Sequence, residues 1–125
     1  MLAKVLIVED NELLALGMTD VLAFAGFEIL GTANRVSEAI AMAERNCPTV
    51  AVIAIHLAGR RDGVEGANIL KNMGAEVVFV SAEWGDETLA RARALEPAAL
   101  LSKPSPRELL SAVQKASRAG QLGQI

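Results

Sequence analysis

The sequence predicts a single α/β domain built around a doubly wound parallel sheet. Five short runs of aliphatic and β-branched residues alternate with five stretches that have helical spacing, and no repeat or low-complexity tract interrupts the alternation. The chain has 125 residues, of which 52% are hydrophobic. This length and composition allow one buried core and are too small for two domains.

The order of these elements predicts the topology. We expect strands at residues 4–8, 27–32, 50–55, 76–80 and 99–102, and helices at residues 11–25, 37–45, 64–73, 86–95 and 106–119. Strands separated by single helices form a parallel sheet with right-handed crossovers and helices on both faces. Five such units fit the flavodoxin-like three-layer sandwich with strand order 2-1-3-4-5. We expect the domain to span residues 1–120, with residues 121–125 as a C-terminal tail.

Three helices carry more detailed predictions. In the first helix, the apolar residues are expected to crowd onto one buried side, namely Leu13, Leu14, Leu16, Met18, Val21, Leu22 and Phe24. Ser37 is expected to cap the second helix. Ser105, Pro106 and Glu108 predict a capping box with proline at the first helical position of the last helix, and Gly120 is expected to begin a frayed end.

The composition excludes several classes of protein. A net charge of −3 argues against a nucleic-acid-binding surface. One Cys and one His rule out an internal disulfide and make a His-based zinc site improbable. The sequence contains no apolar run of the ~18 residues that a membrane span requires, and the start lacks the features of a secretory signal. We therefore expect a cytoplasmic protein without membrane or nucleic-acid partners.

The candidate site lies where the predicted strands end. Glu9 and Asp10 follow the first strand, Ser81 follows the fourth and Lys103 follows the fifth. In an open parallel sheet these carboxyl ends share one edge, where ligands bind at the reversal of strand order. Two adjacent carboxylates favour a hard cation such as Mg²⁺, although they also suit a solvated helix start. Lys103 precedes Pro104 and Pro106, which stiffen its loop. Lys103 and the Ser81 hydroxyl could face a small oxyanion, although each alone is an ordinary surface residue.

Four segments together give a resemblance to a known family. VLIVEDN, IHLAGRRDG, VVFVSA and LLSKPSPRELL occur in this order over nearly the whole chain, and this combination resembles the CheY-like receiver domain of bacterial two-component response regulators. The resemblance implies that Glu9, Asp10 and the backbone carbonyl of His56 bind Mg²⁺. It further implies that Ser81 and Lys103 contact the phosphoryl group.

The phosphoacceptor position departs from the family pattern. Matching the HLAGRRDG loop to the family places the acceptor aspartate at position 54, where this sequence has Ala54. A methyl group cannot attack a phosphoryl donor or ligate Mg²⁺, so we expect no aspartyl phosphate, no enzymatic turnover and weakened Mg²⁺ binding. Either the domain is a natural pseudo-receiver that acts through phosphorylation-independent contacts, or an engineered change has replaced aspartate. Retention of Glu9, Asp10, Ser81 and Lys103 favours the second explanation.

The resemblance also implies a switch and partners. Ser81 and Leu100 occupy the two switch positions, but the family usually has an aromatic residue where Leu100 stands. In a phosphorelay the expected partner is a sensor histidine kinase or a histidine phosphotransfer protein. A homodimer through the face made by the fourth helix, fifth strand and last helix is also expected.

Overall fold

The computed structural model describes residues 3–122 as one α/β sandwich. Its strands are β1 (Lys4–Val8), β2 (Glu28–Ala33), β3 (Val50–Ala54), β4 (Glu76–Ser81) and β5 (Ala99–Ser102). Its helices are α1 (Glu12–Phe24), α2 (Val36–Arg45), α3 (Gly63–Asn72), α4 (Asp86–Ala94) and α5 (Pro106–Leu122). All strand pairs are parallel and the sheet order is β2-β1-β3-β4-β5. The predicted flavodoxin-like topology is confirmed.

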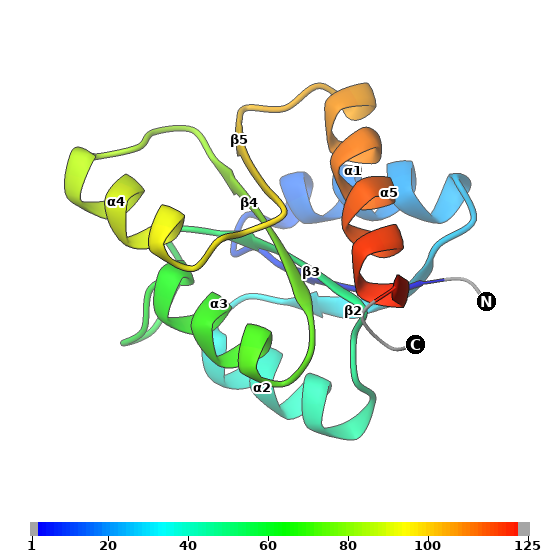
Figure 1. The fold of residues 1–125 in the computed structure, drawn as a ribbon, viewed down its shortest axis with the longest axis horizontal. Helices are drawn as coiled ribbons and strands as arrows, with labels where there is room; N and C mark the ends of the chain where they lie inside the picture. Colours follow the sequence, from blue (N-terminus) through cyan, green and yellow to red (C-terminus); the bar gives the residue numbers. More distant parts are fainter. Residues whose placement is uncertain (1–2, 123–125) are drawn as a thin grey trace.

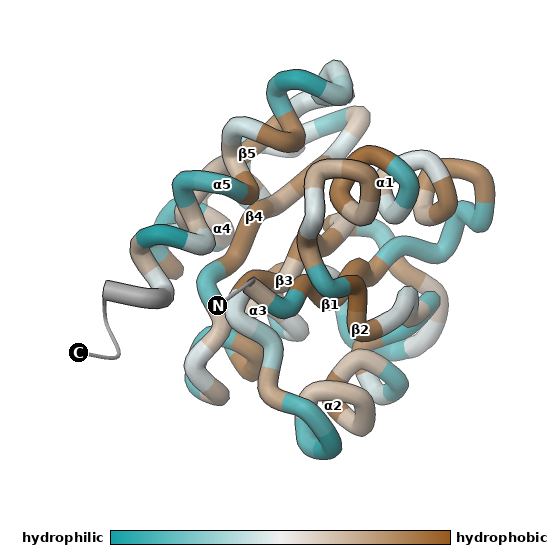
Figure 2. The backbone as a smooth tube through the Cα atoms, turned by 90° about the vertical axis from the view of Figure 1, so that its right-hand side faces the viewer, coloured by the Kyte–Doolittle hydropathy of each residue, from teal (hydrophilic) through white to brown (hydrophobic). Residues whose placement is uncertain are grey.

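Helices cover both faces of the sheet (Figure 1). One core cluster joins α1 and α5 to alternate residues of the central strands, such as Val5, Ile7 and Val52. The other joins α2, α3 and α4 to the intervening residues, such as Leu6 and Phe79. Figure 2 shows the same arrangement as hydrophobic strands enclosed by helices of mixed hydropathy. Because side chains alternate between the two faces of a strand, a strand covered on both sides must be apolar throughout. All five residues of β3 are buried, as this requires.

The face that α1 buries differs from the prediction. Only Ala15 and Leu22 are buried in this helix, whereas Leu13, Leu14, Leu16 and Phe24 are 80%, 57%, 57% and 97% exposed. The apolar residues of α1 surround most of the helix, so they cannot all face one sheet at 3.6 residues per turn. The predicted crowding of these residues on one buried side is therefore wrong.

Two helix ends also differ from the prediction. Helix α2 begins at Val36 after the N-cap residue Arg35, so Ser37 lies inside the first turn and is not the cap. The N-cap thus lies two residues before the predicted one, and the first helical residue, Val36, is buried at 2% exposure. Helix α5 continues through Gly120 to Leu122, past the predicted end at Ala119. Gly120 is buried in close contact with Thr49, so a frayed end beginning at Gly120 is wrong. Of the predicted tail, residues 123–125 lie outside the described residues.

The capping box predicted at the start of α5 is confirmed. The backbone N–H of Ser105 donates to Glu108 over 3.1 Å, and the N–H of Glu108 donates to the Ser105 hydroxyl over 3.2 Å, which is the predicted capping box. Within the part of the chain that the structure describes, no helix is both long enough and apolar enough to span a membrane.

Candidate functional site

The parallel sheet gathers the predicted site residues along one edge. Glu9 follows the last residue of β1, Ala54 ends β3, Ser81 ends β4 and Lys103 follows the last residue of β5. Glu9, Ser81 and Lys103 line one pocket of about 270 Å³. Its remaining walls come from α1, the end of β4 and the strand-end loops, namely from Leu14, Met18, Val80, Ala82 and Pro104. This pocket, called here the strand-end pocket, combines one carboxylate, one ammonium group and one hydroxyl with a largely apolar wall.

Ala54 lies deep at the centre of this edge. It is 7% exposed, it pairs with Val80 in the sheet register, and it belongs to the cluster beneath α1 and α5. The start of α3 lies directly against it, because a side chain at Gly63 would collide with the carbonyl oxygen of Ala54. The side chain at position 54 is therefore held between rigid elements, and its methyl group offers no polar atom to a ligand.

Ser81 and Lys103 are joined through the backbone. The N–H of Lys103 donates to the carbonyl of Ser81 over 3.0 Å, and Lys103 has a φ of +42° immediately before Pro104. The left-handed region is uncommon for a residue with a side chain, so the loop holds this lysine in a costly conformation. The Ser81 hydroxyl donates to the carbonyl of Glu83 over 2.7 Å. It must rotate away from Glu83 before it can donate to an anion in the strand-end pocket.

The acidic pair has an unusual electrostatic environment. Burial raises the pKa of the Glu9 carboxyl, and the neighbouring Asp10 raises it further. The N–H of Asn11, which donates to Glu9 over 3.1 Å, opposes this shift by stabilising the ionised form. The net direction is upward. A cation held by both carboxylates would remove the repulsion between them.

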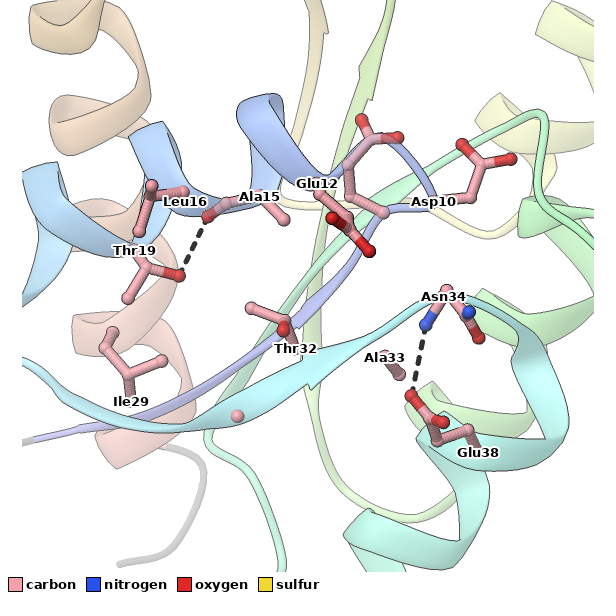
Figure 3. Close-up of a pocket in the computed structure, with 12 residues that line it drawn as sticks. Asp10, Glu12, Ala15, Leu16, Thr19, Ile29, Thr32, Ala33, Asn34 and Glu38 are labelled. Carbon is pink, nitrogen blue, oxygen red and sulfur yellow. Dashed lines mark hydrogen bonds between the residues drawn. The ribbon is translucent and has the colours of Figure 1, made fainter.

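A second hollow brings more acids beside this pair (Figure 3). It has a volume of about 590 Å³ and lies between α1 and β2, with Glu9, Asp10, Glu12 and Glu38 among its lining residues. Figure 3 shows Asn34 and Glu38 at one end, joined by a hydrogen bond of 3.2 Å, and Leu16, Thr19 and Ile29 at the other. The charge of this hollow suits a cation at its acidic end.

The donor set fits Mg²⁺ only in part. Glu9 and Asp10 supply adjacent carboxylates, and His56 lies two residues beyond Ala54, on the exposed loop after β3. Oxygen donors of this kind are those that Mg²⁺ takes, usually together with several waters. However, residues 3–122 contain no group of three His, Cys, Asp or Glu side chains able to hold a metal ion. Ala54, at the end of the neighbouring strand β3, adds no oxygen donor to this pair.

An ion pair beside the site, between Asp62 and Arg91, was not found by sequence reasoning. Asp62 caps α3 by accepting the N–H of Glu65 over 2.9 Å, and it also forms an ion pair of 2.8 Å with Arg91 of α4. Burial opposes ionisation of Asp62, but the hydrogen bond from Arg91 and the N–H of Glu65 outweigh it and hold the Asp62 pKa below its ordinary value. Asp before Gly at a helix start is a recognisable cap signal, whereas the contact with Arg91 depends on packing.

The proposed switch residue Leu100 is half-buried. It lies opposite Phe79 in the register of β4 and β5 and packs against the cluster formed with α2, α3 and α4. Trp84 is also half-buried and packs edge-on against Phe79 with ring centroids 6.1 Å apart. An aromatic residue therefore lies close to Leu100 in space, although none occupies position 100 itself.

The fold and the convergent strand ends define a receiver-type α/β domain, and the comparisons with known proteins agree. The model of the response regulator receiver domain family matches residues 5–114, so the chain belongs to that family. Among solved structures, it is similar to the signal receiver domain of a modulated diguanylate cyclase from Desulfovibrio desulfuricans G20. That similarity has a TM-score of 0.91 and 30% identity, and it covers 98% of this chain and 99% of the other. A CheY-like receiver domain protein from Methanospirillum hungatei JF-1 has a TM-score of 0.89 at 22% identity, covering 98% and 99% of the two chains, and supports the fold alone.

Two curated relatives are regulators. The transcriptional regulatory protein PdtaR of Mycobacterium tuberculosis is 32% identical over 115 residues, which cover 90% of this chain and 56% of that protein. The phyllosphere-induced regulator PhyR of Methylorubrum extorquens is 31% identical over 115 residues, which cover 90% and 42% of the two chains. The chain thus spans about half the length of the curated relatives it matches.

Proposed function

We propose that this chain is the receiver domain of a two-component or phosphorelay response regulator in which Ala54 blocks phosphorylation. The observation that carries the proposal is the strand-end pocket, which places Glu9, Ser81 and Lys103 together at the edge where Ala54 ends β3. The partner is a sensor histidine kinase or a histidine phosphotransfer protein in the cytoplasm. With aspartate at position 54 the domain would act as a phosphoryl acceptor, whereas in the present form it offers a signalling surface without phosphorylation or enzymatic turnover.

The proposed chemistry requires aspartate at position 54. An aspartate oxygen there would attack the phosphorus of a partner's phosphohistidine, the P–N bond would break, and the imidazole nitrogen would keep the electron pair. Lys103 would neutralise charge on the transferred group. Mg²⁺, held by Glu9, Asp10 and the His56 carbonyl, would supply further charge neutralisation when bound. The modified aspartate would add about −1.5 to −2 charge beside Ser81, which would favour rotation of the hydroxyl away from Glu83.

Restoring the acceptor tests this proposal. We expect the Ala54→Asp variant to bind beryllofluoride in the presence of Mg²⁺ and to change Trp84 fluorescence, since Trp84 lies three residues after Ser81 and packs on Phe79. It should also gain the mass of one phosphoryl group with a small-molecule phosphodonor. The Ala54→Asn variant has the same shape without the charge and should do neither. If Ala54→Asp shows no binding of beryllofluoride by calorimetry and no change in Trp84 fluorescence, the proposal is contradicted.

The second candidate function is a phosphorylation-independent interaction module in which Ala54 is native. The exposed apolar side chains of α1 favour it, because Leu13 and Phe24 are 80% and 97% exposed on the helix that borders the strand-end pocket. The chromosomal codon for position 54 distinguishes an engineered change from a native alanine. An aspartate codon indicates an engineered acceptor change, and an alanine codon indicates a native pseudo-receiver.

A homodimer through α4, β5 and α5 stays a prediction, for which sedimentation at several concentrations is the test.

A further inference from the structure

A third pocket lies apart from the strand-end pocket and is lined by three arginines. It has a volume of about 310 Å³, and its lining includes Arg35, Ser37, Gly59, Arg60 and Arg61. No acidic residue is among the lining residues. We propose that this pocket, called here the arginine pocket, binds a small ligand that carries a phosphate or diphosphate group.

The fold holds these arginines together although they are distant in sequence. Arg35 precedes α2, while Arg60 and Arg61 lie in the loop between β3 and α3. A parallel bridge between Arg35 and Ala58 fastens the two segments to each other. Gly59 has a φ of +96°, and a side chain at this position would reach within 3.7 Å of the Arg35 Cβ atom. The backbone of the loop therefore lies directly beside Arg35, and the pocket is a feature of tertiary structure.

The positive charge of the arginine pocket is unpaired. Among residues 3–122 the only ion pair within 4.0 Å joins Arg91 to Asp62, so Arg35, Arg60 and Arg61 have no carboxylate partner there. Three like charges around one hollow repel each other, in a chain whose net charge is −3. An oxyanion between them would relieve this repulsion. Guanidinium groups match phosphate oxygens with paired, charge-assisted hydrogen bonds, which favours phosphate over a diffuse anion.

The size of the arginine pocket favours a small ligand over a protein surface. Pockets for small molecules have volumes of roughly 300–1,000 Å³, and the arginine pocket lies at the lower end of that range. Ser37 adds a neutral hydroxyl to the lining. Lys103 is not among the lining residues, so the proposed ligand does not depend on the strand-end pocket or on the residue at position 54.

Calorimetric titration of the full chain with inorganic pyrophosphate, at low ionic strength and without Mg²⁺, tests the proposal. We expect one saturable site, and Arg35→Gln and Arg60→Gln should each weaken it by about tenfold through loss of a charged donor. Arg118→Gln removes the same charge from an exposed position of α5 and should leave the affinity unchanged. Lys103→Gln should also leave it unchanged. Amide NMR shifts on binding should concentrate at residues 35–37 and 58–61.

Four results would overturn the proposal. The first is the absence of saturable binding to the unmodified chain. The second is equal weakening by Arg118→Gln, which would indicate a general charge effect. The third is loss of binding in Lys103→Gln, which would place the anion in the strand-end pocket. The fourth is tighter binding of a phosphoserine peptide than of pyrophosphate, which would assign the arginines to a protein partner. None of these results depends on whether Ala54→Asp accepts a phosphoryl group.

Discussion

Single residues decide what the site of this chain can do. Asp62 lies outside the strand-end pocket but stabilises an element that packs against the site. Asp62 caps α3, the helix that packs against Ala54, and its ion pair with Arg91 fastens α4 to the same corner. Its pKa is lowered in the folded chain. A carboxylate with a lowered folded pKa contributes stability above its unfolded pKa, and this contribution is lost as the pH falls through the folded value.

Replacing Arg91 should change this titration. In Arg91→Gln the hydrogen bond and the positive charge are lost, so the pKa of Asp62 should rise toward its ordinary value. The stability that Asp62 contributes above its unfolded pKa should then shrink, so the variant should be less stable at neutral pH and should lose less stability on acidification than the unmodified chain. Carboxyl-carbon NMR titration of Asp62 measures the shift, and Arg93→Gln on the same helix is the matched control. An unchanged Asp62 titration in Arg91→Gln would mean that the ion pair is not formed in solution.

Two glycines give a second prediction at the residue scale. A side chain at Gly63 meets the backbone of Ala54, so Gly63→Ala should force α3 away from β3 and lower the free energy of unfolding by about 1–3 kcal/mol. Gly17 lies inside α1 with no atom within 4 Å of an added Cβ. Gly17→Ala should therefore stabilise the chain by about 0.5–1 kcal/mol through helix propensity. Urea denaturation of both variants checks the opposite signs, and equal changes would contradict the close contact at Gly63.

At the scale of elements, local chemistry fixes where some helices begin. The reciprocal hydrogen bonds between Ser105 and Glu108 should make Ser105→Ala lower the free energy of unfolding by about 1 kcal/mol. Ser111 is exposed inside the same helix, and Ser111→Ala should be neutral or slightly stabilising. Chemical denaturation of the pair compares a cap with an interior site. A Ser105→Ala loss no greater than that of Ser111→Ala would show that packing alone holds the helix start.

The sequence predicts the order of elements better than the faces they bury. Apolar strands and amphipathic helices alternate clearly, and the parallel topology then gathers Glu9, Ser81 and Lys103 at one edge. Helix α1 carries apolar residues around most of its surface, so only packing on the sheet selects Leu22 over Phe24 for burial. The arginine pocket could not be predicted either, because it forms where two loops distant in sequence are bridged.

At the scale of the whole molecule, the central sheet belongs to both cores at once. Neighbouring residues of β1, β3 and β4 alternate between the cluster beneath α1 and α5 and the cluster beneath α2, α3 and α4. Neither helical layer can lose its strands without exposing the other layer. This arrangement predicts that the two faces unfold together as one cooperative unit, in the manner of small single domains.

A substitution on one face, followed by a probe on the other, tests this cooperativity. Val113 of α5 is fully buried in the core cluster on the α1 and α5 face of the sheet. Trp84 packs against the core cluster on the other face, which is covered by α2, α3 and α4. Val113→Ala removes two buried methyl groups and should lower the free energy of unfolding by about 2 kcal/mol. Because the sheet is shared, the denaturation midpoint seen by Trp84 fluorescence should fall by the same amount as the midpoint seen by circular dichroism. If the circular dichroism midpoint falls while the Trp84 midpoint stays in place, the two helical layers unfold separately. A structural change at the strand-end pocket could then remain on one face of the sheet.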